Sequence, residues 1–348
     1  MKLFHISHTD LDGYGCQLIT KEFFKEGFFY NANYGLEVKL TIKKALEEIK
    51  NYKDENILLL ISDLNLTFQE STDLDLEINK LTTEGYQIKL QLLDHHVSGK
   101  KSAENFYWYY LDDKRCATKI VYDYMFEEYE GFDCLTSAWL KPLVDSINAV
   151  DIWLEHETKN FEFGKVLMSM ITKVKEINNI LFSDLNREFK FYLLKEASKF
   201  LDEFDGHIKL DNEVHFMKKK FLKLTDKDDT LDNLSAAYLV KTLDDVKENL
   251  TVVYKEQKGL LTYCLGSISI PANAFLKANP EYDFFIDLNK KGNASFRADG
   301  IVDVSLIAAK IAGGGGHVNA SGGRFEDFKE SISYIDVKNY VQNKLDKI

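Results

Sequence analysis

Short apolar runs alternate with helical stretches over the first third of the chain, and this alternation constrains the fold more than any other feature. Strand-like runs cover residues 2–6, 57–62 and 86–93. Helical patterns cover the segments around them, at residues 16–24, 36–49, 74–82 and 117–126. Strands separated by helices are typical of a parallel sheet with helices on both faces. The pattern therefore predicts an α/β fold in which ligands bind at the carboxyl ends of the strands.

The chain has 348 residues, which is more than a single hydrophobic core usually serves. Residues 163–224 lose the strand signal and read as helical, and we expect their charges to lie on a solvated face. A smaller α/β pattern begins near Leu231, with strands at 250–254, 260–265, 282–287 and 294–297 and helices at 234–241, 304–311 and 331–345. We predict a first domain over 1–185, a helical connector over 186–230 and a second domain over 231–348.

Charge and composition limit the classes of partner. The chain carries 44 Lys and Arg against 56 Asp and Glu, a net charge of -12. Such a surface repels a long phosphate backbone, so duplex DNA is not an expected partner. The apolar runs are too short to span a bilayer and no signal-peptide pattern opens the chain, so we expect a cytoplasmic protein without membrane contact. Four scattered cysteines are expected to be buried and reduced: Cys16, Cys116, Cys134 and Cys264.

Metal-binding residue types follow each of the three predicted strands of the first domain. They are His8, Asp10 and Asp12 after the first strand, Asp63 after the second, and Asp94, His95 and His96 after the third. In an extended segment, residues two apart point the same way. Carboxylate oxygens combined with imidazole nitrogens suit manganese, magnesium or a similar divalent ion. Because these residues exceed the need of one ion, we expect two ions that share a carboxylate, an arrangement that cleaves phosphate esters.

Each of these residues also has a purely structural interpretation. A single Asp after a strand is usually a helix cap or a turn residue. His5 lies inside the first strand and is expected to be a packed histidine, and two adjacent histidines alone are weak evidence. Recurrence of the pattern at three strand ends favours a shared site.

Two sets of motifs resemble one known family. His8-Thr-Asp10-Leu-Asp12-Gly13, Asp63 and Asp94-His95-His96 resemble the first three motifs of the DHH phosphoesterase superfamily. In the second domain, Ser295-Phe-Arg297, Val302-Asp-Val304 and the run from Gly313 through His317 to Gly322 resemble the DHHA1 domain of nanoRNases and RecJ-type exonucleases. Together the two matches bracket nearly the whole chain. The resemblance implies a parallel-sheet DHH domain joined by a helical connector to a smaller α/β DHHA1 domain.

The resemblance also implies roles for the residues of the first domain. His8 and Asp10 would hold one manganese ion, Asp12 and His95 would hold the other, and Asp63 would bridge the two. A fourth motif implies one more aspartate, for which Asp151 is favoured by its neighbour Trp153 and Asp145 is the competitor. Asp94 is expected to orient His95, and His96 to meet the scissile phosphate as the catalytic histidine.

One departure from the family pattern concerns the first motif. A single residue separates His8 from Asp10, where many family members have two. In this respect the chain resembles the nanoRNase-B and RecJ-like variants. No long basic insertion or additional nucleic-acid-binding domain follows the second domain, as would be expected in a processive RecJ exonuclease.

Substrate binding is expected in the second domain. The glycine run can bring backbone N–H groups close to an anion, because no side chain intervenes. We therefore assign substrate contacts to Gly314, Gly315, Gly316, His317, Arg297 and Arg324. Arg115, which precedes the helix at 117–126, is a further candidate for a phosphate at that helix N-terminus. The aromatic run 105–110 is expected to be core or strand, with base stacking as the less favoured alternative.

These expectations combine into a metal-dependent phosphodiesterase that hydrolyses short oligoribonucleotides. Activity on 3′-phosphoadenosine 5′-phosphate is a further expectation. The alternatives are a cyclic dinucleotide phosphodiesterase, a RecJ-like single-strand exonuclease, and a nucleotide-sensing protein that binds without cleaving. The expected cofactor is a pair of divalent ions, manganese first, and a homodimer is left open.

Overall fold

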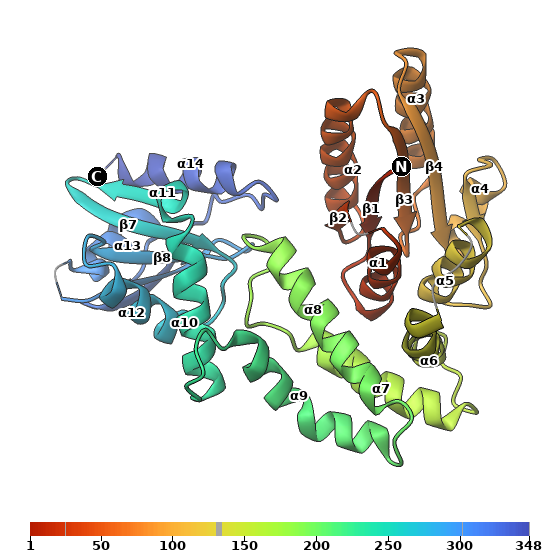
Figure 1. The fold of residues 1–348 in the computed structure, drawn as a ribbon. Helices are drawn as coiled ribbons and strands as arrows, with labels where there is room; N and C mark the ends of the chain where they lie inside the picture. Colours follow the sequence, from red (N-terminus) through yellow and green to blue (C-terminus); the bar gives the residue numbers. More distant parts are fainter. Residues whose placement is uncertain (25, 130–133, 301, 348) are drawn as a thin grey trace. The chain divides into compact units, whose positions relative to one another are not determined.

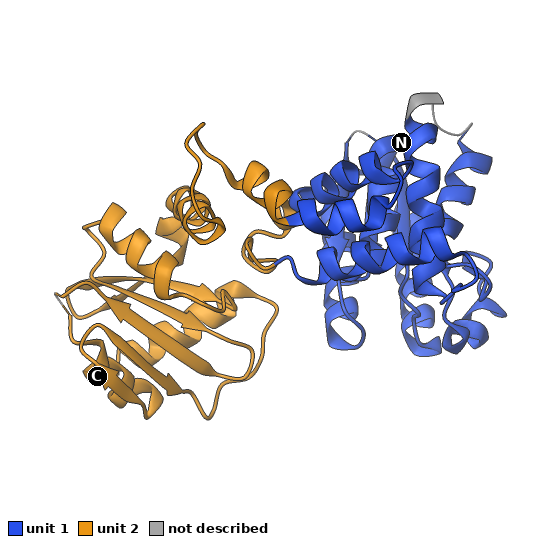
Figure 2. Cartoon of the chain, turned by 90° about the horizontal axis from the view of Figure 1, so that it is seen from below, with its two compact units in different colours: residues 1–174, 187–214 blue, residues 175–186, 215–348 orange. Residues whose placement is uncertain are grey.

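The structure is a computed structural model that describes residues 1–24, 26–129, 134–300 and 302–347. It divides into two compact units, coloured separately in Figure 2. Unit 1 comprises residues 1–174 and 187–214, and unit 2 comprises residues 175–186 and 215–348. The predicted connector, 186–230, therefore contributes to both units. No helix among the described residues is long and apolar enough to cross a membrane.

Unit 1 is built on a five-stranded parallel sheet in the order β2-β1-β3-β4-β5. Its strands are β1 (Lys2–Ser7), β2 (Gly27–Asn31), β3 (Asn56–Ser62), β4 (Gln87–Asp94) and β5 (Tyr109–Leu111). Its helices are α1 (Leu11–Phe23), α2 (Leu36–Ile49), α3 (Phe68–Thr83), α4 (Lys100–Ala103), α5 (Ala117–Glu128), α6 (Cys134–Asp151) and α7 (Thr158–Thr172), with short 3-10 turns at Lys50–Tyr52 and Val97–Gly99. The predicted α/β class is confirmed, whereas the edge strand β2 and the helix α6 were not predicted.

Helices cover both faces of this sheet (Figure 1). Apolar residues of α2 and α3 pack on one face, against residues such as Phe4, Leu59 and Leu92. Apolar residues of α1, α5 and α6 pack on the other face, against residues such as Leu58 and Leu60. Successive residues of the central strands therefore point into two different cores, which explains why these strands read as continuous apolar runs.

The aromatic run at 105–110 divides between core and surface. Trp108 and Tyr109 are buried in the core of unit 1. Tyr107 is almost fully exposed. The expectation of core or strand residues holds for the buried pair. Among the cysteines, Cys16 and Cys116 are buried and free, and Cys264 is free and partly buried; the side chain of Cys134 is outside the described part.

Helices α8 (Ser183–Ala197) and α9 (Gly206–Leu222), with the short turn Ser198–Phe200 between them, fall in the stretch predicted to carry a solvated charged face. That expectation is wrong at three positions, because Arg187, Lys190 and Lys218 are buried. Lys218 is paired with Glu176 at 2.7 Å. The sequence pattern could not predict that these residues are buried, because Lys and Arg are counted as polar whether or not the fold buries them.

Unit 2 has a mixed six-stranded sheet in the order β10-β11-β9-β8-β7-β6, in which only the β7–β8 pair is parallel. Its strands are β6 (Thr251–Tyr254), β7 (Gln257–Tyr263), β8 (Phe284–Leu288), β9 (Asn293–Ala298), β10 (Gly315–His317) and β11 (Ala320–Arg324). Besides the start of α8 and the end of α9, which otherwise belong to unit 1, the helices of unit 2 are α10 (Leu231–Asp244), α11 (Lys247–Leu250), α12 (Ser269–Ala278), α13 (Val304–Ala312) and α14 (Tyr334–Leu345). Residues of α13 and α14 pack on one face of the sheet. This agrees with the predicted smaller α/β pattern, although α12 was not predicted.

His5 links three elements of unit 1 through its imidazole. Its Nδ1 lies 2.7 Å from the Thr20 hydroxyl on α1, and its Nε2 lies 2.8 Å from the Ser62 hydroxyl on β3. Burial, and then the charge of Arg187, lowers the pKa of His5 from 6.5 to about 3. The expectation of a packed histidine is confirmed.

The pKa of His5 gives a prediction for stability against pH. Below about pH 6.5 the unfolded chain binds a proton at His5, whereas the folded chain keeps His5 neutral until the pH approaches 3. The stability that the hydrogen bonds of neutral His5 give the folded chain is therefore complete above pH 6.5 and is lost as the pH falls toward 3. We therefore compare the native protein with His5→Gln, which cannot bind this proton. Below pH 6.5 the difference between their free energies of unfolding should change by about 1.4 kcal/mol per pH unit, to the disadvantage of the native protein. Urea denaturation of both proteins between pH 7.5 and 5 tests this. A constant difference across that range would contradict it.

Candidate metal centre

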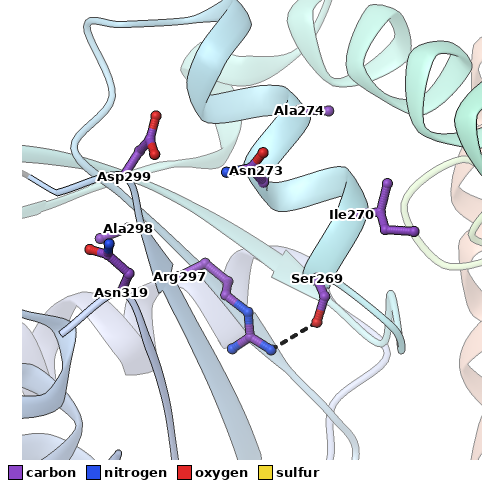
Figure 3. Close-up of a pocket in the computed structure, with 8 residues that line it drawn as sticks. All are labelled: Ser269, Ile270, Asn273, Ala274, Arg297, Ala298, Asp299 and Asn319. Carbon is purple, nitrogen blue, oxygen red and sulfur yellow. Dashed lines mark hydrogen bonds between the residues drawn. The ribbon is translucent and has the colours of Figure 1, made fainter. Parts of the chain in front are cut away.

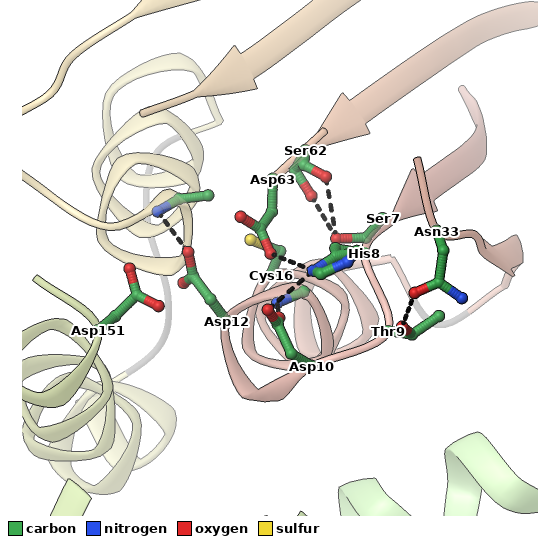
Figure 4. Close-up of polar contacts among 12 residues, drawn as sticks. Ser7, His8, Thr9, Asp10, Asp12, Cys16, Asn33, Ser62, Asp63 and Asp151 are labelled. Carbon is green, nitrogen blue, oxygen red and sulfur yellow. Dashed lines mark hydrogen bonds and ion pairs between the residues drawn. The ribbon is translucent and has the colours of Figure 1, made fainter. Parts of the chain in front are cut away.

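The candidate centre lies at the carboxyl ends of β1, β3 and β4, which are adjacent strands of the parallel sheet. Ser7 pairs with Ser62, and Ser62 pairs with Leu93, so the three strands end at the same level. The residues that follow, His8, Asp63 and His95, are thereby brought to one edge. Figure 4 shows the aspartates gathered there.

The segment between β1 and α1 bends at Thr9 and Asp10. Asp10 caps α1, accepting a hydrogen bond at Oδ1 from the Gly13 N–H at 3.0 Å. Its Oδ2 lies 2.8 Å from His8 Nδ1. A side chain at position 13 would bring its Cβ to 2.3 Å from the His8 carbonyl oxygen, so only glycine permits this close approach.

Asp63 stands at the end of β3 in a left-handed backbone conformation, with φ 56°. Aspartate tolerates this region better than most residues. Its N–H donates to the Leu93 carbonyl at 3.1 Å, which fixes it beside β4. The carboxylate is buried, and its Oδ2 has no hydrogen-bond partner among the described residues.

Asp12 is held by the N-terminus of a distant helix. Its two carboxylate oxygens accept hydrogen bonds from the N–H groups of Ala117 and Thr118, at 2.8 and 2.7 Å. These are the first two residues of α5, where backbone N–H groups lack partners within the helix and favour an anion. The Thr118 hydroxyl also donates to the Asp12 carbonyl oxygen. The backbone of α5 therefore holds the Asp12 carboxylate in position without a metal ion.

The two carboxylate oxygens of Asp63 face different histidines. Its Oδ1 lies 3.4 Å from His95 Nε2, and its Oδ2 lies 3.7 Å from His8 Nδ1. His95 Nε2 also lies 3.6 Å from carboxylate oxygens of Asp12 and Asp151. Three sets of potential ligand atoms, each within 4.8 Å of one another, result: His8 with Asp10 and Asp63, Asp12 with His95 and Asp151, and Asp63 with His95 and His96.

This donor set fits divalent cations. Carboxylate oxygens and imidazole nitrogens are the ligands that manganese and magnesium accept in proteins. The buried, unpartnered Oδ2 of Asp63 is an acceptor that a cation would satisfy. Asp63 belongs to two of the three ligand sets, one with His8 and Asp10 and one with His95 and His96.

The fourth-motif candidates lie in different surroundings on α6. Asp151 ends the helix beside His95. Asp145 is paired instead with Lys141, one turn earlier, at 2.7 Å. The geometry therefore keeps Asp151 in the candidate ligand set and leaves Asp145 outside it.

Sequence comparisons identify relatives over the whole chain. The chain is 43% identical over 342 residues to a 3′,5′-cyclic-nucleotide phosphodiesterase of Helicobacter pylori, covering 98% of each chain. It is 25% identical over 342 residues to the oligoribonuclease NrnB of Bacillus subtilis, covering 92% of this chain and 72% of that protein. A crystal structure of an uncharacterized Helicobacter pylori protein matches with a TM-score of 0.94, 43% identity and full coverage of both chains. No protein-family model matches the chain.

The chain belongs to the DHH phosphoesterase superfamily. It is a hydrolase with phosphodiesterase chemistry, as the names of the two relatives support. The motif resemblance found in the sequence is confirmed, and with it the expectation of an enzyme.

The side chains of the tripeptide Asp94-His95-His96 point in two directions. His95 faces Asp12, Asp63 and Asp151, as described above. Asp94 is fully buried and accepts two hydrogen bonds, from His96 Nδ1 at 2.7 Å and from the Tyr109 hydroxyl at 3.0 Å. Asp94 thus orients His96, and the expectation that it orients His95 is wrong. Alternation along the extended segment explains this, because residues 94 and 96 point to the same side.

Tyr34 is a neighbour of the DHH motif that sequence reasoning missed. Its hydroxyl lies 3.2 Å from His96 Nε2, and its ring centre lies 5.0 Å from that of His8. The hydrogen bond that His96 donates to Asp94 raises the pKa of His96, although burial opposes this. His96 therefore retains a proton more readily than an ordinary histidine does. Nothing in the sequence around position 34 signals this contact, which depends on the pairing of distant strands.

Arg115 is engaged by carboxylates of its own surroundings. Its guanidinium donates to Asp112 at 2.7 Å, to Asp123 and to the Tyr110 hydroxyl. The N-terminus of α5, where a phosphate was expected, is filled by the Asp12 carboxylate. We therefore leave Arg115 out of the proposed site.

Unit 2 of this DHH enzyme contains a pocket of about 430 Å³ between α12 and the end of β9 (Figure 3). Arg297 lies in it and donates to the Ser269 hydroxyl at 3.1 Å. The remaining lining includes Asn273, Asp299 and Asn319. Polar side chains from a helix, a strand and a loop thus line this pocket, an arrangement suited to a small polar ligand.

The glycine run forms a helix end and an edge strand, where a loop was expected. Gly313 ends α13 with φ 56°. The following β10 contains Gly315, Gly316 and His317 and pairs only with β11. A side chain at position 314 would approach the Gly322 carbonyl oxygen too closely, which explains that glycine by backbone packing.

The predicted substrate residues of unit 2 are only partly grouped. Ala320 pairs with both His317 and Arg297, so these two lie near the same end of β11. Arg324 pairs with Asn293, four residues along β9 from Arg297. Arg324 is exposed, with Glu326 at 3.7 Å.

Electrostatic repulsion within the DHH centre is strong. Burial, followed by the charges of Asp12 and Asp10, raises the pKa of Asp151 from 3.8 to about 9. Burial and the same two neighbours, with Asp151, also raise the pKa of Asp63. The folded chain without metal therefore binds protons that the unfolded chain releases, and these two groups contribute stability that is lost as the pH rises from about 4 toward 9.

This repulsion predicts opposite effects of one substitution with and without metal. In chelator at pH 8, Asp151→Asn should raise the free energy of unfolding by about 1 kcal/mol or more, because it removes a partly buried carboxyl group that Asp12 and Asp10 repel when it is ionised. The same variant should lose much of the stabilisation that manganese gives the native protein. Thermal denaturation with chelator and with manganese measures both effects.

The matched control is Asp145→Asn on the same helix, whose carboxylate pairs with Lys141. It should leave the manganese effect unchanged. Loss of that effect in Asp145→Asn, with Asp151→Asn unaffected, would reverse the choice between the two aspartates.

Proposed function

We propose that this chain hydrolyses the 3′,5′-phosphodiester bonds of small nucleotides, short oligoribonucleotides above all, with the help of two divalent metal ions. The observation that carries the proposal is Asp63, whose two carboxylate oxygens face separate sets of ligand atoms on either side. The likeness to the oligoribonuclease NrnB of Bacillus subtilis supports the substrate class.

The proposed ligands combine the groups of ligand atoms around Asp63 and Asp12. His8 and Asp10 would hold one ion, and Asp12, His95 and Asp151 would hold the other, with Asp63 shared. Two divalent ions bound there would neutralise the charge that develops on the phosphate during hydrolysis. Manganese is the proposed metal.

His96 is the proposed donor to the phosphate. Its Nδ1 bonds to Asp94, which favours the imidazolium form, so that Nε2 also carries a proton. That proton can be donated to a phosphate oxygen in place of the Tyr34 hydroxyl. During hydrolysis the water oxygen bonds to phosphorus, one ester oxygen leaves, and the departing oxygen takes up a proton. Asp94 and Tyr109 keep His96 in position.

A 3′,5′-cyclic nucleotide is the second candidate substrate. The relative named for that activity is 43% identical over 98% of the chain, against 25% identity for the oligoribonuclease. Both substrates contain the same ester bond, so one centre can serve either. 3′-Phosphoadenosine 5′-phosphate remains a third candidate.

A panel of substrates tests the function. With manganese we expect the enzyme to cleave two- and five-residue RNAs, and to cleave a twenty-residue RNA more slowly. A chelator should abolish the activity. Asp63→Asn should lower kcat at least about a hundredfold while the far-ultraviolet spectrum stays native, because both ligand sets lose a charge. Rapid hydrolysis of 3′,5′-cyclic nucleotides without RNA cleavage would favour the second candidate, and near-normal turnover by Asp63→Asn would contradict the shared-carboxylate proposal.

The pocket of unit 2 is proposed to bind the nucleotide part of the substrate through Arg297, with His317 and the glycines 314–316 nearby. Arg297→Ala and His317→Ala should raise KM on dinucleotides about tenfold, because a charged hydrogen bond to the ligand is lost. Manganese affinity should not change, since the proposed ligands belong to unit 1. Steady-state kinetics and manganese titration provide the two readouts.

Lys277→Ala is the matched control, because Lys277 lies on the exposed side of α12, the helix that lines the same pocket. Its KM should equal that of the native enzyme. Loss of manganese binding in His317→Ala would place that histidine among the metal ligands and contradict the assignment.

A further inference from the structure

Tyr34 lies beside the metal centre, yet it follows none of the strands that carry the proposed ligands. It is part of the loop between β2 and α2. Its hydroxyl lies 3.2 Å from His96 Nε2, and its ring centre lies 5.0 Å from that of His8. The ring centres of Tyr34 and His96 are 5.9 Å apart. One phenol side chain thus contacts both a proposed metal ligand and the proposed phosphate donor.

The loop that carries Tyr34 is anchored to the segment that carries His8. Three hydrogen bonds connect residues 31–33 to residues 7–9. They run from the Ala32 N–H to the Ser7 carbonyl oxygen at 3.0 Å, from the Asn31 amide to the His8 carbonyl oxygen at 2.9 Å, and from the Thr9 hydroxyl to Asn33 Oδ1 at 2.7 Å. Tyr34 follows these residues directly, so its ring is held in a defined position beside the two histidines.

Tyr34 and its neighbours are reachable from solvent. Tyr34 is 43% exposed, and the side chains of Asp10 and His96 are 50% and 34% exposed. The side chains of Asp12 and Asp63, by contrast, are 1% and 2% exposed. A substrate that comes from solvent therefore meets Tyr34, His96 and Asp10 before it meets the buried carboxylates.

The Tyr34 hydroxyl has hydrogen-bonding capacity that the protein leaves unused. A phenol hydroxyl can both donate and accept hydrogen bonds. Within the described part of the chain, the contact with His96 Nε2 is the only hydrogen-bonding contact of this hydroxyl. A phosphate oxygen that accepts a hydrogen bond from Nε2 takes the place of the hydroxyl. The displaced hydroxyl is then within reach of the same phosphate and can donate to it.

The location of the phosphate follows from the two groups that would hold it. The ring centres of His95 and His96 are 4.3 Å apart, so a proposed metal ligand and the proposed phosphate donor are direct neighbours. A phosphate bound to a metal ion at His95 and to His96 Nε2 therefore lies beside the Tyr34 hydroxyl. A phenol is protonated at neutral pH, because its ordinary pKa is about 10. It can therefore donate a hydrogen bond without adding negative charge to the carboxylates of the centre.

We propose that Tyr34 is a catalytic residue whose hydroxyl donates a hydrogen bond to a non-bridging oxygen of the phosphate that is cleaved, alongside His96. The proposal rests on the proposed function, the hydrolysis of a phosphodiester. The non-bridging oxygens gain negative charge as water attacks phosphorus, so this hydrogen bond is stronger in the transition state than in the bound substrate. The hydroxyl keeps its proton throughout. Loss of the hydroxyl should therefore lower kcat and change KM little.

Tyr34→Phe is the decisive variant, because it keeps the ring beside His8 and removes the hydroxyl alone. On a two-residue RNA with manganese, we expect kcat to fall at least about tenfold and KM to change less than about twofold. The far-ultraviolet spectrum and the affinity for manganese should stay native, since Tyr34 is not a proposed ligand. An unchanged kcat, or a loss of manganese affinity, would overturn the proposal.

A sulfur substitution in the substrate separates a direct contact from a role in positioning His96. Replacing one non-bridging oxygen of the dinucleotide by sulfur gives two diastereomers, and sulfur accepts hydrogen bonds weakly. On the diastereomer that places sulfur at the oxygen bound by Tyr34, Tyr34→Phe should cost less than about threefold, because the hydrogen bond is already lost. On the other diastereomer the cost should remain at least about tenfold. Equal costs on both diastereomers would show that the hydroxyl acts through His96 and would overturn the proposal.

Tyr107→Phe is the matched control, because it removes the same hydroxyl elsewhere in unit 1. Tyr107 is 97% exposed. It precedes the amino end of β5, whereas the metal centre lies at the carboxyl ends of the strands. Both kcat and KM of this variant should equal those of the native enzyme. A loss in Tyr107→Phe as large as that in Tyr34→Phe would show an effect that does not depend on the centre, and would contradict the proposal.

Binding of a phosphate monoester provides a readout that does not depend on turnover. A monoester carries between about 1.5 and 2 negative charges at pH 7. In calorimetry on the full chain with manganese, Tyr34→Phe should bind adenosine 5′-monophosphate at least about fivefold more weakly than the native protein does, and adenosine equally well. Equal monophosphate affinity in both proteins, or an equal weakening for adenosine, would exclude the contact with phosphate. If the native protein cleaved no dinucleotide, the proposed function would fail, while this comparison would still decide whether Tyr34 binds phosphate.

Discussion

The convergence of four carboxylates at one edge of a parallel sheet is the constraint on which the rest of unit 1 depends. Asp10, Asp12, Asp63 and Asp151 repel one another, and the raised pKa of Asp151, caused by burial and then by Asp12 and Asp10, expresses that repulsion. Backbone groups hold the arrangement against it. The N-terminus of α5 binds Asp12, the first turn of α1 binds Asp10, and the left-handed conformation of Asp63 fixes it at the end of β3. The fold therefore maintains a site whose charge a pair of cations would balance.

The parallel sheet makes this arrangement possible because its strands all end at one edge. β1 and β3 pair in register, and β3 pairs with β4. Apolar layers on both faces bury the strands, so that their ends are held rigidly. Buried hydrogen bonds among His5, Ser62 and Thr20 connect the same strands to α1. A centre that must hold like charges together is thus supported by strands whose ends are fully buried.

Two kinds of group complement the carboxylates, and they do so from different parts of the chain. His96, oriented by Asp94, supplies a proton donor beside the centre. Arg187, buried on α8 and far from His8 in sequence, donates to Asn31, whose amide donates to the His8 carbonyl oxygen. The pocket of unit 2 offers Arg297 together with neutral polar side chains. Membership of the DHH superfamily accounts for the carboxylates and histidines, whereas the link from Arg187 to His8 is a feature that the geometry of this chain reveals.

The sequence by itself determined the α/β class and the central strands, because strands and helices have different periodicities. It also determined the ligand-type residues after the strands, because these residues follow the strands directly in the chain. It could not determine that Asp94 turns to His96, that α5 binds Asp12 through its backbone, or that the glycine run pairs as an edge strand, since each depends on contacts between distant segments. The burial of Arg187 and Lys190 was hidden for the same reason. Only the tertiary structure decides which charged residue faces solvent and which faces a site, because composition fixes a residue's charge and packing fixes its surroundings.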